Sequence, residues 1–288
     1  MSQNRPTLSW IPVRLFPAVL VEKTVTVEQW LEQAAAFGLP AVEIYEPFLN
    51  TNDRWSVDEV GKILTRLGLR VSMVTASPDL THPDAGARRR EIAATERAVE
   101  HAAALRATAV RCTTGQAHPG LAEREGLELV SGALVHLAEY ARPLGVKIAV
   151  ENHFRDRMVA ELPDFAQRKD VFLKLVELVR DTPVMVNLDC SNPLMVGESA
   201  MDILPAVRGK LVSVHASDRK RGAYLHSPIG EGEVDYPAIF QALAQSGYSG
   251  WISIEDGQPF GGEGFGRSLA FVRGAIDSYW GAQPSGGN

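Results

Sequence analysis

The sequence predicts a single α/β domain of the (β/α)8 or TIM barrel type. Short apolar runs rich in β-branched residues alternate with longer amphipathic runs eight times along the 288 residues, as strands alternate with helices in such a barrel. Glycines occur where a helix would end before the next strand. No expected strand leads into the GxGxxG turn that opens a doubly wound dinucleotide-binding sheet. These observations favour the closed barrel over an open sheet.

Each expected strand is a short apolar run bounded by polar or turn-forming residues. Strands that are connected through helices run parallel, and eight such units close most simply into a barrel. The expected strands are Leu8–Phe16, Ala41–Tyr45, Arg70–Thr75, Ala109–Cys112, Lys147–Glu151, Val184–Asp189, Leu211–His215 and Trp251–Glu255.

Each expected helix is an amphipathic run between two of these strands. The expected helices are Val27–Phe37, Ser56–Leu67, Ala85–Leu105, Leu121–Leu144, Leu162–Arg180, Met201–Val207, Tyr236–Ser246 and Gly264–Trp280. Five glycines are expected to take the left-handed conformation that ends a helix, namely Gly38, Gly68, Gly145, Gly209 and Gly247.

The composition limits the partners and the compartment of the chain. The net charge of -6 argues against a nucleic-acid partner. The two cysteines have no zinc-site or disulfide-framework spacing, which fits a cytoplasmic protein. The apolar stretch Leu8–Val21 is interrupted by Arg14 and two prolines, so we expect no signal peptide and no membrane partner. No linker divides the chain, so residues 1–282 are expected to form one domain and 283–288 a loose tail.

Four successive expected strands end in side chains that can bind a metal. The strand ends carry Glu151, Asp189, His215 and Glu255. Active sites of these barrels lie at the carboxyl ends of the strands, so the four side chains are expected to converge. Three carboxylates that converge need a cation. Carboxylate oxygens with one imidazole favour Mn²⁺, with Mg²⁺, Co²⁺ and Zn²⁺ as alternatives.

In their order along the chain, several motifs resemble the sugar phosphate isomerase/epimerase superfamily. These xylose isomerase-like barrels include ketose 3-epimerases, hydroxypyruvate isomerase, inosose dehydratase and endonuclease IV. The motifs are GLPAVEIY, the segment LTHPDAGARRREIAATERAVEHAAALRATAVR, GVKIAVENH, NLDCSN, VHASD, PIGEGEVDYPAIFQAL and GWISIE. The resemblance implies one divalent metal at Glu151, Asp189, His215 and Glu255. It also implies that Glu151 and Glu255 are the acid/base pair.

This resemblance predicts a metal-dependent isomerase or epimerase of a small keto-sugar, polyol or hydroxy-carbonyl compound. A metal that binds the substrate's carbonyl and hydroxyl oxygens would stabilise an enediolate, and two carboxylates could remove and return the proton. The alternatives are a lyase or dehydratase that uses the same site, and a sugar-binding barrel without turnover. A DNA-repair enzyme would need more histidines at strand ends. Association into a homo-oligomer through the outer helices is compatible with the sequence.

Four further residues are predicted to contact the substrate. His153 follows strand 5, and His226 lies in the long loop after strand 7, where the family places substrate contacts. Arg221 has the spacing from strand 7 at which ketose epimerases carry an arginine, and Arg219 is its competitor. Asn192 stands where many members carry histidine, and unlike histidine it cannot take up a proton near neutrality. A helix or turn cap is the alternative role for Asn192.

Three other predictions concern the walls of the site. Glu43 is expected to form a salt bridge with an arginine of a neighbouring strand, such as Arg14 or Arg111, and a functional residue in the wall of the site is the alternative. Four aromatic residues form either core packing or an apolar wall against a sugar, namely Trp10, Tyr45, Phe48 and Phe154. Arg219 to Arg221 and the glycines of 261–266 lie where barrels often bind phosphate, but an exposed charge cluster is the favoured explanation.

Overall fold

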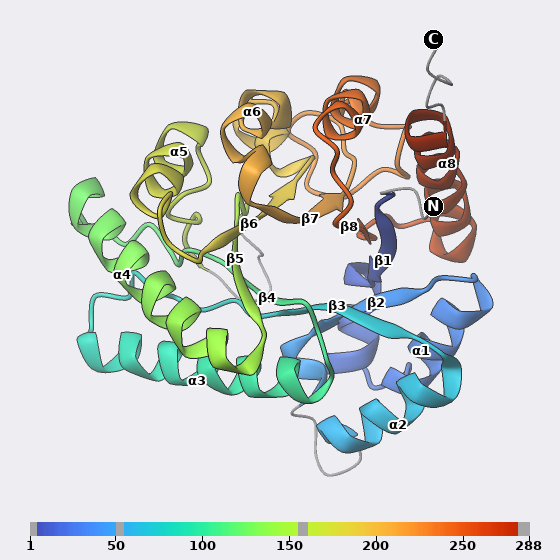
Figure 1. Ribbon diagram of the computed structural model, residues 1–288, viewed down its shortest axis with the longest axis horizontal. Helices are drawn as coiled ribbons and strands as arrows, with labels where there is room; N and C mark the ends of the chain where they lie inside the picture. The colour runs from blue at the N-terminus through green and yellow to red at the C-terminus, as the bar shows by residue number, and fades with distance from the viewer. Residues whose placement is uncertain (1–4, 50–54, 155–160, 282–288) are drawn as a thin grey trace, which may run out of the picture.

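The computed structural model describes residues 5–49, 55–154 and 161–281. Eight parallel strands form one sheet in the order β1-β8-β7-β6-β5-β4-β3-β2, and β1 also lies beside β2, so the sheet curls into a nearly closed barrel. The helices surround the strands on the outside, and α8 lies near β1 where the chain completes the circle (Figure 1). The predicted (β/α)8 barrel is confirmed.

The element bounds agree closely with most of those expected from the sequence. The strands are β1 Thr7–Ile11, β2 Ala41–Tyr45, β3 Arg70–Thr75, β4 Ala109–Cys112, β5 Lys147–Glu151, β6 Met185–Asp189, β7 Leu211–Ala216 and β8 Trp251–Glu255. The main helices are α1 Val27–Ala36, α2 Val57–Leu67, α3 Ala85–Ala104, α4 Glu123–Ala141, α5 Lys169–Leu178, α6 Leu204–Val207, α7 Tyr236–Gln245 and α8 Gly261–Gly281.

Several helices begin at a side chain that accepts a hydrogen bond from the first turn. Thr26 and Gln29 form a reciprocal capping box at α1, with distances of 3.1 and 2.9 Å. Ser56, Asp84 and Asp235 cap α2, α3 and α7 without the reciprocal bond, each through a side-chain oxygen that accepts a backbone N–H group. These caps fix where the chain leaves each loop at the carboxyl end of the barrel.

The glycine predictions are confirmed at four positions and wrong at one. Positive φ values between 66° and 73° occur at Gly38, Gly68, Gly145 and Gly247. Gly209 instead continues a short 3₁₀ helix, Arg208–Lys210, which runs directly into β7, so no left-handed residue is required there.

The first strand is shorter than predicted. The expected strand Leu8–Phe16 ends at Ile11, and the chain turns into a 3₁₀ helix, Val13–Leu15, and then a π-helical turn, Pro17–Val21. Pro12 has no N–H to donate to a neighbouring strand, which limits the strand at that point.

Two helices also differ from the prediction. The expected helix Leu162–Arg180 begins only at Lys169. The preceding residues are tied to the loop after β4, because Phe165 N–H donates to the carbonyl of Gly115 at 2.7 Å. The expected helix Met201–Val207 is divided into a 3₁₀ turn and the single turn α6.

Alternation along the strands directs the functional side chains into the barrel. The residues that directly precede the four predicted ligands in β5, β6, β7 and β8 are fully or almost fully buried in the apolar core, and they are Val150, Leu188, Val214 and Ile254. Successive strand residues point to opposite faces. The residue after each of these apolar side chains therefore points towards the barrel interior.

The prediction of one domain over residues 1–282 and a loose tail over 283–288 stays a prediction. The proposed tail, 283–288, lies outside the described residues. Among the helices of the described ranges, none has the length and apolar character required to cross a bilayer.

Candidate functional site

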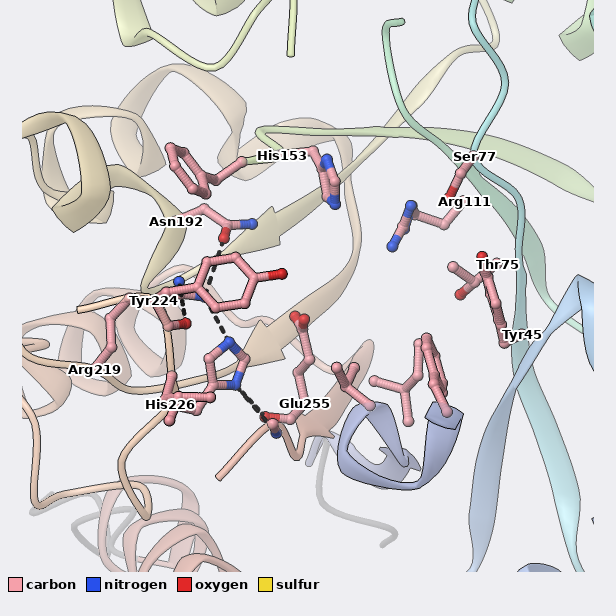
Figure 2. Close-up of a pocket in the computed structure, with 16 residues that line it drawn as sticks. Tyr45, Thr75, Ser77, Arg111, His153, Asn192, Arg219, Tyr224, His226 and Glu255 are labelled. Carbon is pink, nitrogen blue, oxygen red and sulfur yellow. Dashed lines mark hydrogen bonds between the residues drawn. The ribbon is translucent and has the colours of Figure 1, made fainter. Parts of the chain in front are cut away.

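The four predicted metal ligands meet at the carboxyl end of the barrel. One ligand atom from each of Glu151, Asp189, His215 and Glu255 lies within 4.8 Å of all the others. Strand register contributes directly, because Asp189 and His215 are paired positions of β6 and β7. Three of the side chains are buried, and that of Glu255 is 16% exposed. Figure 2 shows Glu255 among the side chains that line a cavity at this end of the barrel.

Two polar atoms of the cluster lack hydrogen bonds. Nδ1 of His215 lies 3.1 Å from Oε2 of Glu255 and 3.6 Å from Oε2 of Glu151. Both Nδ1 of His215 and Oε2 of Glu255 are buried without a hydrogen-bond partner among the described residues. A buried polar atom without a partner is costly, and a cation that both atoms bind would remove that cost. The donor set therefore fits a divalent metal.

Asp189 is held by donors from two loops. Its Oδ1 accepts the N–H groups of Ser191 at 2.9 Å and Asn192 at 2.5 Å, and its Oδ2 accepts the Ser217 hydroxyl at 2.7 Å. Burial raises the pKa of Asp189 well above its ordinary value, and the nearby carboxylate of Glu255 adds to this effect. A bound cation would favour the ionised form of this carboxyl group.

The two glutamates have the opposite tendency. Burial opposes ionisation of Glu151, but the charges of Arg111 and His215 outweigh it and hold the pKa of Glu151 at about 2. Burial likewise opposes ionisation of Glu255, and contact with His215 holds its pKa well below its usual range. For His215, burial favours the neutral form, but the charges of Glu43 and Glu151 raise its pKa well above the ordinary value. Both proposed acid/base groups are thus carboxylates near neutral pH.

Arg111 is a member of the site that the sequence analysis did not assign to it. Its Nε lies 2.6 Å from Oε2 of Glu151, and its Nη1 donates to the carbonyl of Ala76 at 3.3 Å. Figure 2 shows the guanidinium directed into the cavity. An arginine inside the apolar run of β4 was the available signal, because a buried guanidinium requires a carboxylate or carbonyl partner.

Glu43 does not form the salt bridge expected for it. Its carboxylate contacts Nε2 of His215 at 3.0 and 3.1 Å, and it also accepts the Thr75 hydroxyl. Arg14 instead pairs with Asp256 at 2.6 Å, and Arg111 pairs with Glu151. The prediction failed because the strand ends of β2 and β7 meet through the barrel interior, which sequence distance does not reveal.

Three of the four predicted substrate-contacting residues line the cavity. They are His153, Asn192 and His226. His153 Nδ1 lies 2.9 Å from Oδ2 of Asp164, and although burial lowers the pKa of His153, the hydrogen bond to Asp164 raises it above the ordinary value. Asn192 Nδ2 donates to Glu151 at 3.4 Å. Its side chain therefore does not cap the turn that begins at this residue.

Arg219, and not Arg221, is the arginine of the loop after β7 that lines the cavity. The guanidinium of Arg219 is buried and donates to Ser191 Oγ at 2.9 Å and to Asn192 Oδ1 at 3.3 Å. It also lies 2.5 Å from Nε2 of His226, and Figure 2 shows this chain of contacts leading to Glu255. Arg221 is exposed and faces Glu233 at 4.0 Å.

The imidazole of His226 has contacts at both nitrogens. Arginine nitrogens only donate, so Nε2 of His226 accepts from Arg219. Nδ1 lies 3.2 Å from the carbonyl oxygen of Glu255 and 3.2 Å from the backbone nitrogen of Gly257. Burial, with the charge of Arg219, lowers the pKa of His226 to about 4.

The aromatic residues divide between wall and core. Tyr45 and Phe154 line the cavity, together with Phe16, which stacks on Tyr45 at a centroid distance of 4.4 Å. Trp10 and Phe48 are fully buried in the core. The stacked rings of Phe16 and Tyr45 therefore form an apolar part of the cavity lining.

The sequence and the fold together define the class of this protein. Residues 31–274 match the xylose isomerase-like TIM barrel family, so the chain belongs to that family. It is a sugar isomerase/epimerase-like barrel with a candidate Glu/Asp/His/Glu metal site.

Particular relatives are similar over different lengths. An L-ribulose-5-phosphate 3-epimerase, UlaE, of Shigella boydii serotype 18 is 29% identical over 165 residues, which cover 46% of this chain and 56% of that protein. The match therefore spans about half the length of that relative. The crystal structure of a D-tagatose 3-epimerase-like protein has a TM-score of 0.77 at 18% identity and covers 95% of this chain and 98% of that one. The IolI protein, described with a bound zinc atom, has a TM-score of 0.76 at 17% identity, with 95% and 99% covered.

Proposed function

We propose that this protein is a divalent-metal-dependent isomerase or epimerase of a small keto-sugar, polyol or hydroxy-carbonyl compound. The convergence of Glu151, Asp189, His215 and Glu255, with two buried polar atoms that lack hydrogen-bond partners among the described residues, carries the proposal. When bound there, a divalent cation would act as a Lewis acid that acidifies the C–H group next to a substrate carbonyl.

Glu151 and Glu255 are the proposed acid/base pair. Their strands, β5 and β8, are not neighbours in the sheet, so the two carboxylates approach the cluster from separate parts of the barrel wall. One glutamate would take the substrate proton as a carboxylate, and the other would return a proton that it must first take up itself. Arg111 and Asn187 hold Glu151 in place, at 2.6 and 3.1 Å. Either glutamate can be the base at the start, depending on the substrate's configuration.

The cavity provides two kinds of surface for such a substrate. His153, Asn192 and Arg219 supply polar groups that can contact hydroxyl oxygens. Tyr45 and Phe16 supply an apolar wall for the C–H face of a sugar. A small ligand that is polar on one side and apolar on the other fits this combination.

The proposal also covers the identity of the metal and the cellular compartment. Three carboxylates with one imidazole favour Mn²⁺, with Mg²⁺, Co²⁺ and Zn²⁺ as alternatives. The buried free cysteines, Cys112 and Cys190, support a cytoplasmic location. A homo-oligomer that forms through the outer helices stays a prediction.

Hydrogen exchange tests the proposal. The protein supplemented with Mn²⁺, incubated in deuterated water with a panel of ketoses, inososes and hydroxypyruvate, is expected to introduce deuterium at a carbon next to a carbonyl. Glu151→Gln and Glu255→Gln should each reduce this exchange by at least about 10²-fold, the lower range for acid–base catalysis. Glu263→Gln is a control, because its side chain is 87% exposed.

The products separate the alternatives. An unchanged product mass supports epimerisation or isomerisation, whereas loss of water identifies a dehydratase that uses the same residues. Deuterium exchange that persists in both glutamine variants would overturn the assignment of Glu151 and Glu255. Tight ligand binding without exchange would identify a sugar-binding barrel.

A further inference from the structure

Glu43 is a buried charge that faces a single imidazole. Both Glu43 and His215 have no exposed surface, although they lie 172 positions apart in the sequence. The two carboxylate oxygens lie 3.1 and 3.0 Å from Nε2 of His215. No lysine or arginine nitrogen of the described residues lies within 4 Å of this carboxylate, and its other side-chain contact is the hydroxyl of Thr75.

This contact lies on the far side of the imidazole from the cluster. Nδ1 of His215 faces Glu255 and Glu151, whereas Nε2 faces Glu43. The β2 and β7 strands are not neighbours in the sheet, so the contact crosses the barrel interior. Glu43 itself is absent from the group of side chains that could share one ion. Its carboxylate is therefore placed to act on the imidazole and not on a cation.

The contact with Glu43 determines which nitrogen of His215 carries the proton when the imidazole is neutral. A neutral imidazole carries one proton, and a carboxylate can only accept, so Nε2 is the protonated nitrogen and Nδ1 presents its lone pair. Without Glu43, the proton could occupy either nitrogen and the ring could rotate. An imidazole whose second nitrogen donates to a carboxylate is also a stronger ligand.

We propose that Glu43 is a positioning residue that holds His215 with its proton on Nε2 and its Nδ1 directed at the metal cluster. Thr75 orients Glu43 in turn by donating its hydroxyl proton to the carboxylate. This inference rests on the proposed metal site, but it does not depend on which reaction the site performs. Metal affinity should then depend on a side chain that does not touch the metal.

The test compares metal binding in Glu43→Gln and Glu43→Leu with the unaltered chain, by titration calorimetry with Mn²⁺. The Kd is expected to rise about 10- to 100-fold in Glu43→Leu, the range typical for loss of such a partner. Glu43→Gln, whose amide oxygen can still accept from Nε2, should have a smaller effect. It also keeps the experiment decisive if the leucine variant does not fold.

A matched control removes a carboxylate from a second histidine pair. Asp79 lies 2.7 Å from Nε2 of His118, outside the cluster, so Asp79→Asn should leave the Mn²⁺ Kd unchanged even if it lowers stability. Long-range proton–nitrogen spectra of the Zn²⁺-loaded protein should show a proton on Nε2 of His215. That proton signal should be lost or exchange faster in the Glu43→Leu variant.

The outcomes separate this inference from the proposed function. An unchanged Kd in both Glu43 variants, or a proton on Nδ1 of His215 in the Zn²⁺-loaded protein, would overturn the positioning role alone. Mn²⁺ binding that depends on Glu43, without any substrate exchange, would overturn the proposed reaction and leave the positioning role intact. No Mn²⁺ binding by the unaltered chain would overturn both.

Discussion

Nδ1 of His215 lies 3.1 Å from Oε2 of Glu255, and neither atom has a hydrogen-bond partner within the described ranges. If the imidazole is neutral with its proton on Nε2, two acceptors face each other in a buried setting. This arrangement is unfavourable unless a proton or a metal cation lies between them. The pair therefore links the stability of the barrel to the occupancy of the site.

Metal binding should stabilise the folded chain. At a Mn²⁺ concentration about 100 times the Kd, the free energy of unfolding is expected to rise by about 2.7 kcal/mol. For a chain of this size the melting temperature should rise by roughly 5 °C, measured by calorimetry with Mn²⁺ and with a chelator. Asp189→Asn should lose most of this increase, because an amide is a weaker ligand and carries no charge.

The control for this prediction is Asp181→Asn, whose side chain is 89% exposed and lies away from the cluster. It should keep the full response to Mn²⁺. An equal rise in melting temperature for the Asp189 and Asp181 variants would contradict binding at the four-residue cluster.

Arg111 should compete electrostatically with the metal. In the metal-free protein, Arg111→Met leaves Glu151 buried without its ion-pair partner, which should lower the free energy of unfolding by about 3–5 kcal/mol. The same change removes a positive charge next to the site, so Mn²⁺ should bind about tenfold more tightly or better. Urea unfolding in chelator and calorimetric titration measure the two effects.

Arg111→Lys provides the matched comparison, since it keeps the charge but not the guanidinium geometry. Its Mn²⁺ affinity should remain close to that of the unaltered chain. Weaker Mn²⁺ binding in Arg111→Met would mean that the guanidinium chiefly orients Glu151, contrary to the expectation.

The strand and helix pattern could be predicted from sequence because the two periodicities differ along most of the chain. The prediction failed where a short apolar run can form either a strand or helical turns. Leu15, Phe16 and Val19 are buried as a strand would bury them, but they lie in or beside helical turns after Pro12. Periodicity over so few residues cannot separate these possibilities.

The candidate ligands could be predicted because four consecutive strands end at one edge of the barrel. The contacts between Glu43 and His215 and between Arg111 and Glu151 could not, since they depend on how side chains cross the interior. The choice between two arginines of one loop, Arg219 and Arg221, had no periodic pattern to guide it. Which side chains meet in these places is determined only when the barrel closes.

Arg219 and Arg221 should differ sharply in their effect on stability. Arg219→Met removes the donors to Ser191 and Asn192 from a buried setting, and it should lower the free energy of unfolding by about 2–3 kcal/mol. Arg221→Met alters an exposed side chain and should change the free energy of unfolding by less than about 0.5 kcal/mol. Denaturant unfolding of both variants measures the difference, and equal losses would contradict the placement of Arg219.

His226 should make stability depend on pH. Burial and Arg219 lower its pKa from 6.5 to about 4 in the folded chain. As the pH falls below 6.5, the unfolded chain binds the proton first, so the contribution of His226 to stability is complete above pH 6.5. It is lost progressively down to about pH 4, and the loss amounts to about 3 kcal/mol.

A comparison with His226→Gln isolates this contribution, since glutamine does not titrate and the other ionisable groups cancel in the difference. Unfolding free energies of both proteins should be measured in chelator between pH 4 and 8. The difference between them should be constant above pH 6.5 and should shift in favour of the variant as the pH falls. A difference that does not change with pH would mean that His226 takes up its proton in the folded chain as readily as in the unfolded one.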